Sequence, residues 1–146
     1  MQLNITTDYA VRVLIGLAQA QRRVSASELS ERHNVPRTYI SKIMVSLKEQ
    51  GWLSVKGGAR GGYMLAVPPC EITLKQVFAA MSDEFVLCPC GAGDCAWSGA
   101  DGCAMRRIYR QLQQRVDAML DGVTLETLAC RAPERAPKQA VAQVQA

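Results

Sequence analysis

The chain has 146 residues, of which 49% are hydrophobic and 21% are charged, and it carries a formal net charge of +4. This length and composition predict one ordinary domain with enough apolar residues for a real core. No basic leader followed by an apolar run opens the sequence, and no apolar stretch is long enough to cross a bilayer, so we expect a cytoplasmic protein with no membrane contact.

The positive charge is concentrated in the first half. Up to Cys70 there are nine Lys and Arg against four Asp and Glu, whereas from Glu71 onward there are eight against nine. Such asymmetry is typical of a protein with a polyanionic partner, but scattered basic residues on solvated helices would produce it too.

The first residues predict two helices. Apolar residues recur at helical spacing between residues 8 and 21, and Thr6 or Thr7 is a suitable N-cap. Ser25 lies three residues before Glu28, which is the capping-box pattern, so a short second helix should begin there.

A third helix is expected between Pro36 and Gly51. Its apolar residues share one face: Ile40, Ile43, Met44 and Leu47. Its start and other face carry the residues that we expect to bind DNA: Arg37, Thr38, Tyr39, Ser41 and Lys42. Two short helices joined by a tight turn, the second basic at its N-terminal end, are typical of a helix-turn-helix.

Two extended runs follow, over residues 52–56 and 63–67, and a glycine-rich tip carrying Arg60 joins them. We interpret this hairpin as a wing, with Lys56 and Arg60 as further DNA-binding residues and Arg60 placed to enter a narrow minor groove. A flexible hairpin with a solvated arginine is the alternative. Together with the helix-turn-helix, the wing predicts a mainly α fold with a small β-hairpin that binds double-stranded DNA.

The stretch "CPCGAGDCAWSGADGC", residues 88–103, contains four cysteines among glycines and acids. Stable disulfides are unexpected in the cytoplasm, and the spacing departs from that of common zinc sites. An iron-sulphur cluster, thiols without metal and, less favoured by this spacing, a structural zinc site remain as interpretations. Cys70 and Cys130 lie outside this stretch and are interpreted as ordinary small apolar residues.

The second half also predicts a short helix over residues 74–81 capped by Thr73, and a long helix from Ala104. Apolar residues recur every four positions along the long helix, and four of them are predicted to form a dimer interface: Ile108, Leu112, Val116 and Leu120. A homodimer would bind a palindromic operator.

The order of these parts divides the chain into a winged helix-turn-helix over residues 1–82, a cysteine-rich loop over 83–103, a dimerisation helix and terminal turn over 104–130, and a disordered tail over 131–146.

The stretches "TTDYAVRVLIGLA", "SASELSERHNVPRTYISKIMVSLKEQGWL", "KGGARGGYMLAV" and "ITLKQVF", with a three-cysteine loop before a long helix, resemble the IscR/NsrR family of bacterial winged-helix regulators. The resemblance covers roughly residues 1–130. It implies a homodimeric transcription factor whose DNA affinity depends on an iron-sulphur cluster, held between the N-terminal helix of one subunit and the cysteine loop of the other.

The resemblance also implies the cluster ligands. Cys90, Cys95 and Cys103 match the three thiolates of the family, and Cys88 is an extra cysteine that could replace Cys90. Asp8, from the other subunit, stands where nitric-oxide-sensing members of the NsrR type have a carboxylate ligand. Asp8 could instead act only as a favourable acid at a helix N-terminus.

Two further positions bear on this site. Members of the IscR type have a histidine three residues after the third cysteine, and this chain has Arg106 there. The one histidine, His33, is interpreted as a surface or capping residue. Arg12 is one turn after Asp8 and could pair with it or support the cluster loop.

We therefore expect a transcriptional repressor that senses nitric oxide, redox or iron status through a cluster of the 4Fe-4S type in preference to 2Fe-2S, and that binds DNA more weakly when the cluster is lost. The alternative is a cluster-free regulator that works through a thiol/disulfide switch. No Cys-His dyad, phosphate-binding loop or paired-carboxylate motif is present in the sequence, so an enzyme is not expected.

Overall fold

The computed structural model describes residues 4–58, 61–83, 86–87 and 104–130. The predicted disordered tail and most of the cysteine-rich loop lie outside these residues. In chain order the elements are α1 (Ile5–Ala20), α2 (Ala26–His33), α3 (Arg37–Glu49), β1 (Leu53–Lys56), β2 (Gly62–Leu65), the 3-10 turn η1 (Pro69–Glu71), α4 (Leu74–Ala80), α5 (Ala104–Gly122) and α6 (Leu125–Cys130). The predicted mainly α fold with a two-stranded hairpin is confirmed.

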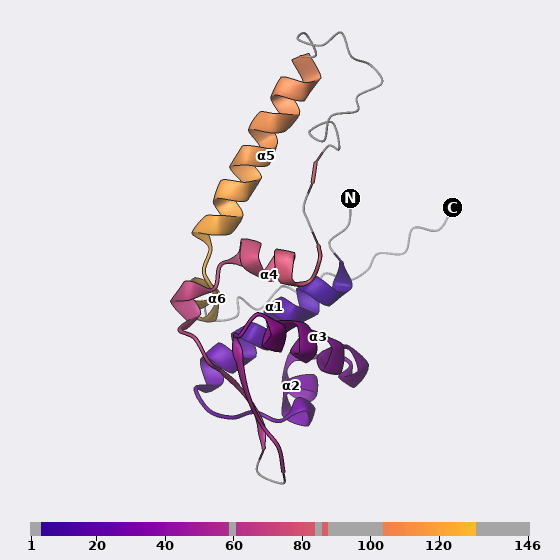
Figure 1. Ribbon diagram of the computed structural model, residues 1–146, viewed down its shortest axis with the longest axis vertical. Coiled ribbons are helices and arrows are strands. Elements are labelled where there is room, and N and C mark those ends of the chain that lie inside the picture. The colour runs from indigo at the N-terminus through magenta and orange to yellow at the C-terminus, as the bar shows by residue number, and fades with distance from the viewer. Residues whose placement is uncertain (1–3, 59–60, 84–85, 88–103, 131–146) are drawn as a thin grey trace, which may run out of the picture.

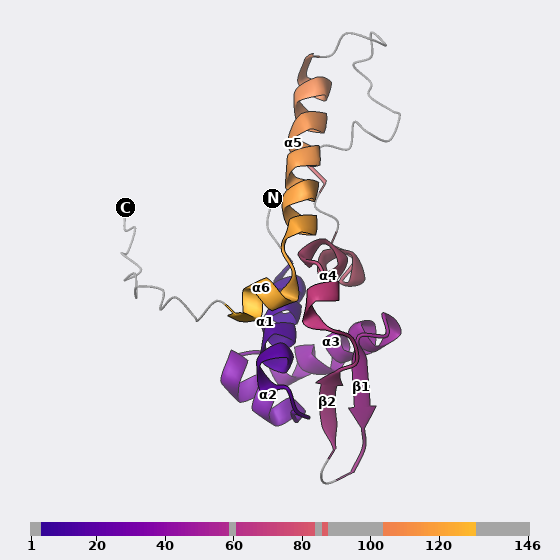
Figure 2. The same ribbon diagram turned by 90° about the vertical axis from the view of Figure 1, so that its left-hand side faces the viewer.

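The elements lie along one long axis, with α1 at the centre (Figure 1). The hairpin β1–β2 projects from one end beside α2, and α5 projects from the other end (Figure 2). The predicted DNA-binding elements and the predicted dimerisation helix are therefore at opposite ends of the molecule. Within the described parts of the chain, no helix is long and apolar enough to cross a membrane.

The core lies between α1, α2 and α3. Its largest fully buried side chains include Leu14 and Leu17 of α1, Leu29 of α2, and Ile43 and Leu47 of α3. These are the apolar positions that recur at helical spacing in the sequence, and burying them against one another orients the three helices. Helix α6 packs on α1 and closes the other side of the core with Leu125, which is 2% exposed.

The start of α1 differs from the prediction. Its N-cap is Asn4, whose side chain accepts a hydrogen bond from the Thr6 amide over 3.0 Å, so the prediction of Thr6 or Thr7 as the cap was wrong. Thr7 instead donates its hydroxyl to Asp83 over 2.6 Å. The Thr7 hydroxyl binds a residue far away in the sequence, and the side chain of Asn4 caps the helix in its place. Asparagine is as favourable at an N-cap as threonine.

The two other predicted caps are present. The Ser25 hydroxyl accepts from the Glu28 amide over 3.2 Å, but the Glu28 carboxylate binds arginines, so only half of a capping box forms. Thr73 caps α4 with a complete capping box in which the Gln76 side chain accepts from the Thr73 amide over 2.8 Å. Both helices therefore begin where the sequence places them.

A seam of hydrogen bonds connects residues 123–129 to α1 and to the segment that begins α4. The Leu74 amide donates to the Val123 carbonyl over 2.8 Å, and the Leu125 amide donates to the Ile72 carbonyl over 2.9 Å. The Gln19 side chain of α1 also donates to the Ala129 carbonyl over 3.1 Å. These bonds fix the C-terminal end of α5 against the winged helix-turn-helix.

Candidate DNA-binding face and sensing segment

Helix α3 has the amphipathic division that a recognition helix needs. Ile40, Ile43 and Leu47 are buried, with no more than 1% of each side chain exposed. Four predicted DNA-binding residues lie on its exposed surface: Arg37, Thr38, Ser41 and Lys42. The turn between α2 and α3 is residues 34–36, and Asn34 in the left-handed region ends α2. This is the tight turn that was expected, and it presents the polar face of α3 to the outside.

Two of the predicted DNA-binding residues also have partners within the protein. The Tyr39 ring packs edge-on against the Tyr9 ring, with centroids 5.1 Å apart and an interplanar angle of 74°, so Tyr39 is only partly exposed. Arg37 donates to the Ser27 hydroxyl on α2. Both contacts restrict the side-chain rotamers at the start of α3 before any ligand binds.

The hairpin is shorter than the extended runs in the sequence, with Leu53 opposite Leu65 and Lys56 opposite Gly62. Lys56 is exposed, and the predicted contact Arg60 lies outside the described residues. Gly62 has φ +149°, and a Cβ there would lie 2.7 Å from the Val24 carbonyl oxygen. Only glycine allows this close approach between the hairpin and the chain before α2.

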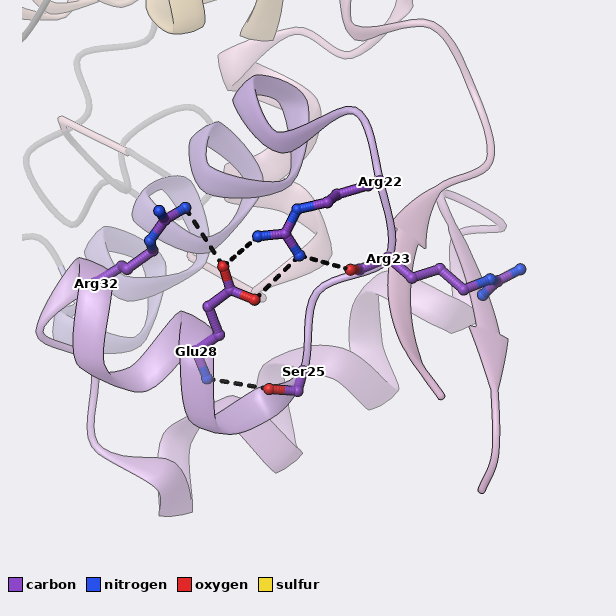
Figure 3. Close-up of polar contacts among 5 residues, drawn as sticks. All are labelled: Arg22, Arg23, Ser25, Glu28 and Arg32. Atoms are coloured by element: carbon purple, nitrogen blue, oxygen red, sulfur yellow. Dashed lines mark hydrogen bonds and ion pairs between the residues drawn. The ribbon is translucent and has the colours of Figure 1, made fainter. Parts of the chain in front are cut away.

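Sequence reasoning missed an arginine cluster beside this contact. Arg22 donates to the Glu28 carboxylate through both terminal nitrogens, at 3.1 and 2.5 Å, and Arg32 lies 3.4 Å from the same carboxylate. Figure 3 shows this group and Arg23, whose side chain points away from it. The hydrogen bond from Arg22 lowers the pKa of Glu28 and raises the pKa of Arg22. The pattern Ser-x-x-Glu signals a cap but does not reveal Arg22, whereas the four-residue spacing of Glu28 and Arg32 on one helix could have indicated that pair.

The predicted cluster ligands Cys88, Cys90, Cys95 and Cys103 lie outside the described residues. Among the residues that are described, no group of three or more His, Cys, Asp or Glu side chains is placed to hold a metal ion. The exposed end of α1 carries the remaining predicted ligand, Asp8.

Asp8 and Arg12 form the pair that the sequence predicted. Asp8 Oδ2 lies 2.7 Å from an Arg12 nitrogen, and both side chains are nearly half exposed. The Arg12 guanidinium also lies 5.7 Å from the centre of the Tyr9 ring, within range of a cation–π contact. Asp8 is in the first turn of α1, where a carboxylate is also favourable without any metal.

The segment that leads to the cysteines is also anchored at the start of α1. Asp83 Oδ2 accepts from the Thr7 hydroxyl over 2.6 Å and from the Asn4 amide over 3.1 Å. Farther along, the Leu87 amide donates to the Gln113 side chain of α5 over 2.9 Å. The segment before Cys88 is thus held between the first turn of α1 and the middle of α5.

Three predictions outside the site need correction. Cys70 and Cys130 were interpreted as ordinary small apolar residues, but both are exposed free thiols, Cys70 in the surface turn η1 and Cys130 at the end of α6. His33 is only partly exposed and does not cap α2, since Asn34 holds the C-cap position. It is half-buried against Gly16 of α1, where a Cβ would lie 2.2 Å from His33 Nε2, and burial followed by the nearby Arg32 lowers its pKa.

Helix α5 carries apolar side chains that the described residues do not cover. Ile108 and Leu112, predicted at a dimer interface, are 43% and 44% exposed, while the other two predicted positions, Val116 and Leu120, are half-buried. Three more apolar side chains on the same helix are also exposed: Met105, Tyr109 and Met119. A strict four-residue repeat drifts around a helix, so alternating steps of three and four residues would have found them.

A helix-turn-helix with an exposed basic recognition helix, followed by a hairpin wing, defines a winged-helix DNA-binding protein. The family model Rrf2, described as "Iron-dependent Transcriptional regulator", matches residues 3–131, and the chain belongs to this family. It is a transcriptional regulator and not an enzyme, as the family and its named relatives show. The resemblance to the IscR/NsrR family of winged-helix regulators is confirmed.

Individual relatives agree with this membership. The HTH-type transcriptional regulator slr0846 of Synechocystis is 32% identical over 130 residues, covering 88% of this chain and 87% of that protein. IscR of Vibrio cholerae is 28% identical over 131 residues, covering 88% of this chain and 75% of IscR. The solved structure of CymR, the global cysteine regulator of B. subtilis, matches 88% of this chain and 96% of CymR with 21% identity and a TM-score of 0.74.

Proposed function

We propose that this regulator binds a palindromic operator as a homodimer and that an iron-sulphur cluster, responding to nitric oxide, redox or iron status, controls its DNA affinity. The observation that carries the proposal is the attachment of Asp83, five residues before the first cysteine of the loop, to Asn4 and Thr7 in the turn that also bears Asp8. Within one chain, these bonds therefore join the approach to the cysteine loop to the turn whose Asp8 would serve the cluster held by the partner subunit's cysteines. The named relative IscR and the iron-dependent description of the family support the same class of sensor.

In this proposal Cys90, Cys95 and Cys103 supply thiolates, with Cys88 in reserve, and Asp8 of the partner subunit supplies a carboxylate. These donor types fit iron, and the nearly half-exposed carboxylate of Asp8 is accessible from outside its own chain. A carboxylate is a weaker ligand for such iron than a thiolate, so a bound cluster, of the 4Fe-4S type in preference to 2Fe-2S, would offer its exchangeable position to a small molecule there.

The role of the protein is to convert that change into a different spacing of its two recognition helices. Arg12 holds Asp8 and lies over Tyr9, and Tyr9 packs on Tyr39 of α3. A shift of the first turn of α1 is therefore transmitted to the start of the recognition helix. Half-sites one helical turn apart tolerate little change in that spacing, so we expect operator affinity to fall.

Anaerobic purification followed by iron and sulphide analysis and an absorption spectrum tests the cofactor. We expect brown protein with iron and sulphide, loss of both in Cys95→Ser and Cys103→Ser, and retention in Cys88→Ser. Asp8→Ala should alter the spectrum and the rate of reaction with nitric oxide in stopped-flow absorbance, whereas Glu126→Ala, which removes an exposed carboxylate from the first turn of α6, serves as the matched control. Identical spectra and rates in Asp8→Ala and wild type would remove Asp8 from the ligand set.

Operator binding tests the DNA-binding face independently of any metal. Arg37→Ala should weaken binding by about 1–3 kcal/mol if it makes a bidentate base contact, and affinity should fall steeply with salt. Arg115→Ala on exposed α5 removes the same charge away from this face and should leave affinity unchanged. Unchanged affinity in both Arg37→Ala and Arg60→Ala, measured by fluorescence anisotropy, would contradict the assigned DNA-binding face.

A cluster-free thiol switch is the second candidate, because the chain resembles CymR, including the S. aureus protein solved in an oxidised form with 23% identity and a TM-score of 0.72. In this alternative two thiolates, such as Cys88 or Cys90 with Cys95, would form a disulfide and pass two electrons to an oxidant such as a peroxide. Colourless protein without iron, whose operator affinity changes reversibly with peroxide and dithiothreitol, would favour the thiol switch over the cluster.

A further inference from the structure

The base of the wing is held by an arginine that no motif singled out. Arg23 lies in the connection between α1 and α2, and its guanidinium reaches both strands of the hairpin. One nitrogen, Nη1, donates to the carbonyl oxygens of Ser54 on β1 and Gly62 on β2, at 3.3 and 3.4 Å. The other, Nη2, donates to the Ser54 hydroxyl over 3.0 Å. One side chain thus bridges the two strands.

The backbone beside Arg23 pairs with the hairpin as well. The Val24 amide donates to the Tyr63 carbonyl and the Tyr63 amide donates to the Val24 carbonyl, both over 2.9 Å. Gly62 makes this pairing possible, because any side chain there would meet the Val24 backbone. The connection before α2 therefore pairs with β2 of the wing as a short third strand would.

The same connection is fastened to α2 from the other side. Arg22 donates to the Arg23 carbonyl over 3.0 Å while its guanidinium binds the Glu28 carboxylate (Figure 3). A continuous set of hydrogen bonds consequently runs from Glu28 on α2, through Arg22 and the Arg23 backbone, to Ser54 and Gly62 of the wing. A two-stranded hairpin is marginal by itself, so such links determine where it lies.

We propose that Arg23 is a positioning residue for DNA binding: it fixes the wing relative to the helix-turn-helix, and thereby sets how well Lys56 and the wing tip reach the operator. This inference rests on the proposed function, in which the wing contacts DNA. The planar guanidinium is suited to the task because its donors point in fixed directions toward several acceptors at once, whereas a lysine ammonium at the same position would bridge them poorly.

The test is a double-mutant cycle between Arg23→Gln and Lys56→Ala, with operator affinity measured by anisotropy at several salt concentrations. We expect Arg23→Gln to weaken binding about tenfold and Arg23→Lys to restore little of it, because the loss is one of geometry and not of charge. In the Lys56→Ala background the effect of Arg23→Gln should shrink, because both changes act through the wing. Hydroxyl-radical footprints of Arg23→Gln should lose protection at the wing-contacted sugars while retaining protection by α3.

Arg32→Gln is the matched control, since it removes an arginine from the same cluster without touching the wing. Ser54→Ala is the second variant if Arg23→Gln melts early by circular dichroism: it deletes one of the three bonds and should cause a smaller loss with the same footprint change. Equal loss in Arg32→Gln would overturn the proposal, because the effect would then be one of charge alone.

Two other results separate this inference from the proposed function. If Lys56→Ala weakens binding but Arg23→Gln does not, the inference is wrong and the proposed function stands. If the two effects add fully and Arg23→Gln lowers the salt slope by about one, Arg23 contacts a phosphate directly and the positioning role is wrong. If Lys56→Ala and Arg60→Ala both bind like wild type, the wing does not contact DNA, and the proposal and this inference both fail.

Discussion

The winged helix-turn-helix and helix α5 use the same kind of apolar periodicity with opposite results. In α3, Ile43 and Leu47 are completely buried by α1 and α2. In α5, Ile108 and Leu112 are 43% and 44% exposed, and Met119 is 72% exposed. One region completes its core within the chain, whereas the other, which projects from one end of the molecule (Figure 2), carries exposed apolar side chains. Amphipathic spacing therefore predicts a helix with a buried face, but it does not say which molecule buries it.

The largest effect should come from the closed core. Leu47→Ala removes a fully buried side chain of α3 and should lower the free energy of unfolding by about 2–5 kcal/mol, because it leaves a cavity among close-packed helices. Val45→Ala is the matched control on the same helix, where the side chain is 58% exposed, and it should change stability by no more than about 0.5 kcal/mol. Urea unfolding at fixed protein concentration measures both. Equal losses would mean that burial does not distinguish the two faces of α3.

A comparable change on α5 should act on assembly. Leu112→Ala should raise the dissociation constant of the dimer by about tenfold or more, because a two-fold interface loses the contact twice and burial of the exposed 44% of each leucine contributes roughly 0.7 kcal/mol or more. Sedimentation equilibrium measures this constant, with the exposed Gln114→Ala as control. A dimer that is unaffected by Leu112→Ala and by Ile108→Ala would place the interface elsewhere and break the comparison.

The seam between the two regions should give a smaller effect. Thr73 caps α4 and lies opposite Thr124 in the bridge that holds the end of α5. Thr73→Val keeps the branched shape but removes the hydroxyl that accepts from the Gln76 amide, so we expect a loss of about 1 kcal/mol. Thermal unfolding followed by circular dichroism provides the measurement. A loss below the error of the fit would mean that the backbone pairing alone defines the start of α4.

The smallest expected effect is a pH dependence within the closed core. The pKa of His33 is lowered by burial and by Arg32, so below its ordinary pKa of about 6.5 the unfolded chain binds more protons than the folded chain. Stability from the neutral imidazole is therefore complete above that pH and decreases as the pH falls toward the lowered value. The difference in melting temperature between pH 7.5 and pH 5.5 should be smaller in His33→Gln than in wild type. Equal slopes would show that His33 does not contribute.

How far sequence reasoning succeeded depended on the distance of the partners. The polar and apolar faces of α3, the cap of α4 and the order of hairpin and helices follow from neighbours within a few positions, and all were predicted. The cap of α1 was not, because the Thr7 hydroxyl is used by Asp83, 76 residues away. His33 was likewise missed, since its half-buried site depends on Gly16 of another helix. The Arg23 bonds to the wing have no local signature at all.

The sequence by itself determined the class of this protein: its periodicities, turn residues and phrases identify a winged helix-turn-helix regulator, because each rests on chemistry local to the chain. Only the tertiary structure decided which polar groups meet. It brought Asp83 to the first turn of α1, placed Arg23 between two strands of the wing, and left the apolar side chains of α5 exposed. The physical reason is that hydrogen bonds and burial are set by distances in space, which spacing along the chain constrains only within a single helix or turn.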